Sequence, residues 1–381
     1  MKIIIAPDSF KGSLTSFQVA NAIGKGFLKV LPKTEIVKIP MSDGGEGTIK
    51  CLIEATEGKY FKEYISNPLG KRIEAEYGVL GEGKTAIIEM ASVSGIMLIP
   101  KEKQNPLYTT TFGTGELIRK VLQRGYKKII LGLGGSATTD GGAGALQALG
   151  AKLLDSKGKN INPGGLYLKK LDKIDISGID KNVKNTELIL MCDVNNALFG
   201  PKGAARVYSS QKGASLSEVE LLERNLSHFV KIIKKDIGKD ISNIPGTGAA
   251  GGLGAGLSSI FNTEFKSGIE VAIEITELSQ LMENTNLVIT GEGELNFQTL
   301  YGKVPIGVAK LAKKKDIPVI VFVGNFEKYT EKLYTNYFDK IISLTSSKIA
   351  KEEAMENAYS LLATRAGEVA KLYKEGVLFE T

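Results

Sequence analysis

Glycines and hydroxyl residues follow a short aliphatic run near the middle of the chain, in a combination that suits anion binding. The stretch is KKIILGLGGSATTDGGAGALQALGA, at 127–151. Residues 129–133 have the pattern of a buried strand, and good helix formers begin at Ala143. A strand–loop–helix turn directs backbone N–H groups toward one point beside the positive end of a helix dipole. The loop therefore predicts a phosphate or carboxylate site at Gly134, Gly135 and Ser136, although tight packing of a helix on a strand would require the same glycines.

Carboxylates stand near the ends of three further strand patterns. Asp43 lies in PMSDGGEGT, Asp193 follows the aliphatic run LILMC, and Glu292 lies in TGEGEL. Carboxylate oxygens beside closely approachable backbone suit a magnesium ion or a general base. Asp43 would serve equally well as the N-cap of the helix that follows it. Asp140, in the central loop, could hold a metal or cap its helix.

One cation, Lys11, lies in the loop DSFKGS that follows the N-terminal strand pattern KIIIA. Open α/β sheets bind ligands at the carboxyl ends of their strands, and this loop is at such an end. Lys11 is therefore a candidate for binding a carboxylate or a phosphate. The alternative is an ordinary exposed loop lysine.

The segment GTGAAG, at 246–251, matches the dinucleotide-binding pattern GxGxxG. That pattern requires a strand immediately before it, and residues 239–245 make a poor strand. The segment is interpreted as a further glycine-rich ligand loop or as a tight packing segment. A nicotinamide-dependent oxidoreductase remains a weaker alternative, which tight NADH binding would support.

Residue types on which other enzyme classes depend are sparse. The one histidine, His228, lies in an amphipathic helix pattern and is expected on a helix face. Cys51 and Cys192 are far apart and form no CxxC pattern, which disfavours a disulfide framework or a structural zinc site. The segment GVLGEGKT, at 78–85, matches GxxxxGK[ST] by letter, but it spans a turn between two strand patterns and no helix pattern follows it, as a phosphate-binding loop would require. No protein-kinase signature occurs in the chain. Glycine, hydroxyl, carboxylate and occasional lysine are the mixture that phosphoryl transfer from a magnesium nucleotide requires.

Composition disfavours two classes of partner. The chain of 381 residues has a net charge of +7, but its lysines are dispersed and are not interleaved with aromatic residues. A nucleic-acid surface would cluster them, so no nucleic-acid partner is expected. No apolar run approaches the length of a bilayer span, and Asp8 interrupts the first apolar run before a signal-peptide core develops. We expect a cytoplasmic protein that acts on small molecules and has no membrane partner.

The elements that must position these residues divide the chain into two domains. Strand patterns near the two ends alternate with helix patterns and predict a doubly wound parallel sheet of about five strands; they lie at 2–6, 35–40, 286–290, 318–323 and 340–344. Residues 1–60 and 285–381 would form this α/β domain. Residues 61–284 would form an inserted mixed α/β domain. Because both domains carry ligand loops, we expect the active site in the cleft between them.

Long motifs in this chain resemble those of bacterial glycerate kinase, of the type that has neither a Walker nor a protein-kinase motif. They are APDSFKGSLT, PMSDGGEGT, TFGTGELI, LGLGGSATTDGGAGALQALGA, CDVNNALFGPKGAA, PGTGAAGGLGAGL and TGEGELNFQT, in this order along nearly the whole chain. The resemblance implies a flavodoxin-like domain interrupted by a second α/β domain. It also implies ATP-dependent phosphorylation of D-glycerate with Mg²⁺, commonly to the 2-phosphate. The implied small-molecule substrates are glycerate and ATP, and a homo-oligomer is left open.

The resemblance suggests a role for each candidate residue. The predicted catalytic residues are Asp43, as the first candidate for the base, Asp193 and Lys11. The predicted substrate-binding residues are Asp8, Ser9, Lys11, Thr114 and Asn296. The predicted nucleotide-binding residues are Gly134, Gly135, Ser136, Gly246, Gly248 and Gly251, and the predicted Mg²⁺ ligands are Asp193 and Glu292.

Four positions depart from the family's usual residues. Glu294 stands where the family usually has Arg, and Asn296 where it usually has Asp. An amide cannot act as an anionic base or neutralise a metal charge. An inactive relative that binds a nucleotide or an organic acid is therefore an alternative, and ligand binding without turnover would identify it. Thr139 for the usual Asn and Ala197 for the usual Pro are milder changes.

Overall fold

The computed structural model describes the chain except for residues 43–46, 243, 327, 346–350 and 380–381. The chain divides into two compact units. Unit 1 comprises Met1–Asp43, Lys50–Thr56 and Ser267–Thr381, and unit 2 comprises Gly44–Ile49 and Glu57–Lys266. Each unit is described by itself below. Among the described helices, none combines the length and the apolar character needed to cross a membrane.

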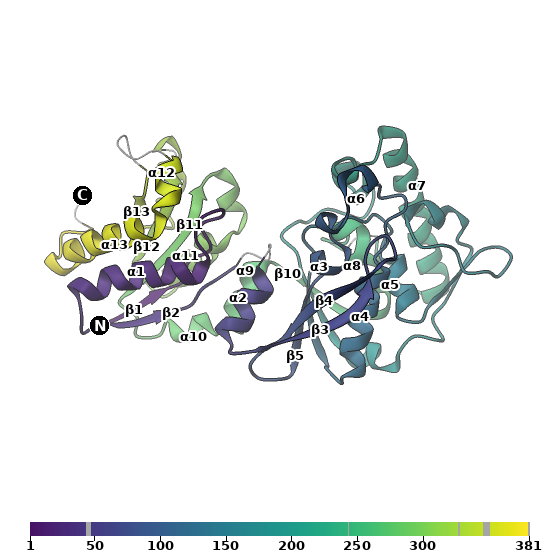
Figure 1. Cartoon of the computed structure of the whole chain (residues 1–381), viewed down its shortest axis with the longest axis horizontal. Helices are drawn as coiled ribbons and strands as arrows, with labels where there is room; N and C mark the ends of the chain where they lie inside the picture. The colour runs from purple at the N-terminus through teal and green to yellow at the C-terminus, as the bar shows by residue number, and fades with distance from the viewer. Residues whose placement is uncertain (43–46, 243, 327, 346–350, 380–381) are drawn as a thin grey trace. The chain divides into compact units, whose positions relative to one another are not determined.

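Unit 1 is built on a five-stranded parallel sheet in the order β13-β12-β11-β1-β2 (Figure 1). The strands are β1 (Lys2–Ile5), β2 (Glu35–Lys38), β11 (Leu287–Leu295), β12 (Val319–Phe326) and β13 (Lys340–Ser343). The helices assigned wholly to this unit are α1 (Ser16–Val30), α9 (Gly268–Ile275), α10 (Leu278–Leu281), α11 (Val304–Lys313), α12 (Lys351–Glu356) and α13 (Ala358–Glu375), and α2 (Thr48–Ala55) spans a boundary between the units. Renumbered within the unit, this strand order is the flavodoxin-like 2-1-3-4-5. The expected doubly wound sheet is confirmed.

Both faces of this sheet are buried, as continuous aliphatic strands require. On one face, Ile3 and Ile5 share a core with α1 and α13, which lie side by side in Figure 1. The alternate residues, such as Ile4 and Val288, point to the other face and are also fully buried. Thr15 followed three residues later by Gln18 predicts a capping box at the start of α1. The structure confirms it, because the Thr15 side chain accepts from the Gln18 N–H and the Gln18 side chain accepts from the Thr15 N–H.

Unit 2 is built on a mixed six-stranded sheet in the order β10-β9-β6-β5-β4-β3. Its strands are β3 (Lys59–Ser66), β4 (Arg72–Val79), β5 (Thr85–Glu89), β6 (Lys128–Gly132), β9 (Glu187–Met191) and β10 (Asn262–Lys266), with a separate hairpin of β7 (Lys152–Leu154) and β8 (Lys173–Asp175). Strands β3, β4 and β5 pair antiparallel, and β5, β6, β9 and β10 pair parallel. The helices are α3 (Ala91–Ser94), α4 (Phe112–Gln123), α5 (Ala143–Ala148), α6 (Ala204–Tyr208), α7 (Leu216–Ile237) and α8 (Leu253–Ile260). The expected mixed α/β architecture is confirmed.

Three elements differ from the sequence prediction. Strand β11 continues through the segment interpreted as a loop, because Glu294 and Leu295 still pair with β12. The segment at 109–116 predicts a hydroxyl-rich glycine loop with a helix from Leu117, but helix α4 already begins at Phe112. Its Gly113 lies where a Cβ atom would overlap the Ser66 carbonyl. Residues 351–374 predict one long closing helix, but the structure has two helices there, α12 and α13, on either side of Asn357. In addition, α9 and α10 belong to unit 1 rather than to the inserted segment.

Candidate active site

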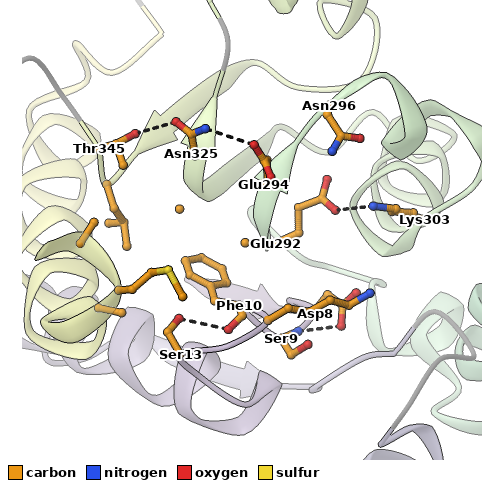
Figure 2. Close-up of a pocket in the computed structure, with 17 residues that line it drawn as sticks. Asp8, Ser9, Phe10, Ser13, Glu292, Glu294, Asn296, Lys303, Asn325 and Thr345 are labelled. Carbon is orange, nitrogen blue, oxygen red and sulfur yellow. Dashed lines mark hydrogen bonds and ion pairs between the residues drawn. The ribbon is translucent and has the colours of Figure 1, made fainter. Parts of the chain in front are cut away.

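A cavity of about 440 Å³ lies in unit 1 at the carboxyl ends of β1, β11 and β12 (Figure 2). Strand β1 pairs with β2 on one side and with β11 on the other, so the point where the chain reverses its direction across the sheet is between β1 and β11. Doubly wound sheets bind their ligands at this point. The polar residues that line the cavity are Asp8, Ser9, Lys11, Ser13, Glu292, Glu294, Asn296, Lys303, Asn325 and Thr345. Four of the five predicted substrate-binding residues are among them.

The loop after β1 is held against β11 by its backbone. The Asp8 N–H donates to the Gly291 carbonyl at 2.8 Å, which extends the strand pairing beyond β1. A Cβ atom at Gly293 would lie 3.2 Å from the backbone nitrogen of Lys11. Glycine at this position therefore permits the loop after β1 to approach β11 closely. Asp8 is 6% exposed and accepts from the Ser9 N–H at 2.6 Å. These contacts present Ser9 and Lys11 to the cavity.

Glu292 forms the buried acidic part of the cavity. Its side chain, in a residue that is 4% exposed, lies with Oε2 3.8 Å from Lys303 Nζ (Figure 2). Lys303 is the N-cap residue of α11, where the helix dipole disfavours a cation, and Glu292 compensates for this. The sequence analysis missed Lys303. Its position directly before the Val304-Pro305 helix start was the signal that could have placed it beside a strand-end loop.

Two of the four departures from the family pattern, Glu294 and Asn296, line the cavity and have defined partners. Asn325 donates to Glu294 at 3.2 Å and accepts from the Thr345 hydroxyl at 3.1 Å (Figure 2). The Asn296 carbonyl accepts from the buried Tyr334 hydroxyl at 2.6 Å. Burial, together with the nearby Glu292 charge, raises the pKa of Tyr334 to about 12, so its hydroxyl remains a donor. Asn296 is therefore fixed at the cavity wall through its backbone.

Unit 2 carries a second group of strand-end loops. Strands β6 and β9 are neighbours, with Gly132 opposite Met191. Beyond β6, Gly134 and Gly135 are exposed and Ser136 is half-buried, and beyond β9, Asp193 is exposed. The predicted phosphate loop and one predicted acid thus follow adjacent strands.

Asp140 organises this loop from inside. It is fully buried and accepts hydrogen bonds from the hydroxyls of Thr110 and Thr111 and from the backbone N–H groups of Thr111, Gly142 and Gly144. Burial raises the pKa of Asp140, and the hydrogen bonds act in the opposite direction. Of its two predicted roles, Asp140 takes that of binding the N–H groups at the start of α5.

The GxGxxG segment is enclosed in unit 2. Gly246, Gly248 and Gly251 are buried, and a Cβ atom at Gly251 would overlap the Thr138 carbonyl of the central loop. The Gly251 carbonyl accepts from the Gly141 N–H at 3.0 Å. Between α7 and Gly246 the described residues contain no strand, so the structural context of a dinucleotide fingerprint is missing there. The segment packs against the central loop at Thr138 and Gly141, behind the predicted phosphate site.

The remaining predicted residues lie elsewhere. Thr114 is fully buried within α4, and its hydroxyl is 2.7 Å from the Ser94 hydroxyl. Asp43 lies outside the described residues. His228 is on α7, with Nε2 2.7 Å from the Leu171 carbonyl, as a helix-face residue. Within the described ranges, no group of three or more His, Cys, Asp or Glu side chains is arranged to hold a metal ion.

Comparison with known proteins assigns this two-unit α/β protein to the kinases, as a phosphotransferase with an alcohol group as acceptor. A crystal structure from Salmonella typhimurium LT2, assigned as a glycerate kinase 2, superposes with a TM-score of 0.90 at 42% identity and covers 99% of both chains. The glycerate kinase family model matches residues 3–374, and the chain belongs to this family.

Curated relatives support the same assignment over nearly the whole chain. Glycerate kinase from Bacillus subtilis (strain 168) is 44% identical over 374 residues, which cover 98% of each chain. Glycerate 2-kinase from Escherichia coli (strain K12) is 45% identical over 370 residues, which cover 97% of each chain. The resemblance inferred from the sequence motifs is confirmed.

Proposed function

We propose that this protein transfers the terminal phosphoryl group of ATP to the 2-hydroxyl of D-glycerate, in a Mg²⁺-dependent reaction. The observation that carries the proposal is the unit 1 cavity, which combines two lysines with buried carboxylates at the ligand-binding point of the sheet. Family membership supplies the reaction class. The Escherichia coli relative, whose name specifies a 2-kinase, favours the 2-phosphate over the 3-phosphate.

The cavity suits a small hydroxy acid. Its volume of about 440 Å³ is at the lower end of ligand pockets, which measure about 300–1,000 Å³. Lys11 would bind the glycerate carboxylate, and Ser9 and Asn296 offer groups that can hydrogen-bond to the hydroxyls. The Lys11 charge is exposed, so it can attract the anion from solution.

In the proposed reaction a carboxylate accepts the proton of the 2-hydroxyl as its oxygen bonds to the γ-phosphorus. The bond between that phosphorus and the ADP oxygen breaks, and ADP and 2-phosphoglycerate leave. Asp43 is the first candidate for this base and Asp193 the second. The ATP phosphates would contact the loop at Gly134, Gly135 and Ser136. The segment with Gly246, Gly248 and Gly251 would support that loop by packing against it.

The residues present fit the donor chemistry of magnesium. Mg²⁺ in kinases is bound through one or two carboxylates together with phosphate oxygens and water, so a large protein cluster is not required. Glu292 in unit 1 and Asp193 in unit 2 are the candidate ligands. When bound, the ion neutralises charge that develops on the phosphate oxygens.

The decisive test is ADP release from ATP with D-glycerate, in the presence of Mg²⁺ or of EDTA. L-Glycerate and a sample without acid serve as controls. We expect turnover that is specific for the D-isomer and dependent on Mg²⁺, and a phosphorus–proton coupling to the C2 proton in the product. A folded protein that binds ATP without turnover would instead favour the inactive-relative alternative, for which Asn296→Asp is the follow-up.

Replacement of Lys11 tests the substrate end of the proposal. Lys11→Met should raise the KM for D-glycerate by about tenfold or more, because an ion pair to the carboxylate is lost, with a smaller change in the KM for ATP. Lys33→Met, at an exposed lysine of the same unit outside the cavity, is the matched control. Unchanged kinetic constants in Lys11→Met would identify Lys11 as an ordinary loop lysine.

A further inference from the structure

Lys212 is a buried lysine directly behind the proposed phosphate loop. It ends a short 3-10 turn, Ser210–Lys212, and is 3% exposed. Its Nζ donates to the Ser136 hydroxyl oxygen and to the Thr138 carbonyl, each at 2.7 Å. Lysine is rarely buried so completely, because removing an ammonium group from water is costly. No motif in the sequence pointed to this residue.

The surroundings of Lys212 have two opposing effects on the pKa of its amine. Burial lowers its pKa to about 7, and the charge of Asp140 opposes this shift. The two groups that accept from its Nζ, on the loop between β6 and α5, are a hydroxyl and a carbonyl, which carry no charge. Among the described residues, Asp140 is thus the ionisable group that faces this amine.

The direction of the hydrogen bond at Ser136 depends on that charge. A hydroxyl has one proton to donate and lone pairs to accept with. When an ammonium group donates to Ser136 Oγ, the Ser136 proton is left for another acceptor. Ser136 is half-buried and follows the exposed Gly134 and Gly135, so an anion on this loop can take that proton. A neutral amine can itself accept the Ser136 proton and withdraw it from the ligand.

We propose that Lys212 is a positioning residue that makes Ser136 a hydrogen-bond donor to the phosphates of ATP. This inference rests on the proposed function. Lys212 strengthens phosphate binding through Ser136 rather than by its own contact, since its amine is buried beneath the loop and donates to Ser136 and Thr138. Charge-assisted hydrogen bonds of this kind are about twice as strong as neutral ones.

The proposal has a definite pH dependence. The amine is charged below about pH 7, where Ser136 is directed to the ligand, and becomes neutral as the pH rises. The KM for ATP should therefore be low at pH 6 and rise by about tenfold by pH 9. The KM for D-glycerate should not follow this profile. Titration of the terminal phosphate of ATP is common to all variants and cancels in their comparison.

The experiment measures the KM for ATP from pH 6 to pH 9 in the wild-type protein and in four variants. Lys212→Met should have a high, level KM across this range. Ser136→Ala should do the same, although it keeps the buried amine and its bond to the Thr138 carbonyl. Lys212→Arg, which keeps its charge throughout, should restore a low KM at pH 9. Lys239→Met is the control, since Lys239 donates to the carbonyls of Ser258 and Phe261 at the end of α8, and it should leave the wild-type profile unchanged.

A wild-type pH profile in both Lys212→Met and Ser136→Ala would overturn the inference. If Lys212→Met fails to fold, Ser136→Ala decides alone. If the wild-type protein shows no turnover of D-glycerate, the proposed function fails separately. Calorimetric titration of the same proteins with ATP then tests the same pH dependence in the dissociation constant, and a level wild-type profile would again reject the role of Lys212.

Discussion

Glu292→Gln is expected to lower kcat by about 10²–10³-fold while the protein remains folded. The substitution keeps the shape of the side chain and removes its charge. Glu292 is 4% exposed and is paired with Lys303 in the cavity, so its charge acts in surroundings where water screens little. Loss of a candidate Mg²⁺ ligand should also raise the Mg²⁺ concentration needed for half-maximal rate.

A second acid on the same strand provides a matched control. Glu294 also lines the cavity, two residues further along β11 and therefore on the same face, but it is bonded to Asn325. Glu294→Gln should change kcat by less than about tenfold, because an amide can still accept from Asn325. An equal decrease of kcat in the two variants would show that the charge of Glu292 contributes no more to the reaction than the charge of Glu294.

Asp140→Ala is expected to destabilise unit 2 by about 3 kcal/mol or more. The substitution leaves three backbone N–H groups and two hydroxyls without their acceptor in a fully buried site. Each buried donor that loses its partner costs about 1–3 kcal/mol unless water reaches it. Urea unfolding followed by circular dichroism would measure the loss, and the KM for ATP should rise as the loop loses its shape.

A partly exposed aspartate in a turn provides the control for this prediction. Asp155 accepts from the backbone N–H groups of Lys157 and Lys159 at 2.9 and 3.0 Å, but unlike Asp140 it is only half-buried. Asp155→Ala should shift the unfolding midpoint far less, because water replaces the lost acceptor. A similar midpoint shift in both variants would contradict the assigned role of Asp140.

Local patterns in the sequence were sufficient for the parallel sheet of unit 1. The run KIIIA could be interpreted directly because a strand buried on both faces needs continuous aliphatic residues. The start of α1 was equally local, since Thr15 and Gln18 complete a capping box within one turn. The run KIIIA also placed the following residues, Asp8, Ser9 and Lys11, at the end of a strand. In the structure these three residues line the cavity.

Glycine-rich segments could not be interpreted in the same way. The sequence identifies a glycine but not the atom that approaches it. Gly113 permits a helix to pass the Ser66 carbonyl, Gly251 faces the Thr138 carbonyl, and Gly293 admits the loop at Lys11. Two of these three lie in packing contacts, and the third lies at the cavity. Only the tertiary structure distinguishes the two uses.

The sequence by itself determined the strands, the fold class and the family of this protein, because aliphatic runs and ordered motifs are properties of neighbouring residues. The tertiary structure decided which charges act together. Lys303 meets Glu292, and Lys212 reaches Ser136 across 76 residues of chain. Strand β11 extends to Leu295 only because β12 offers it backbone partners. Such contacts depend on the packing of distant segments, and no local spacing encodes them.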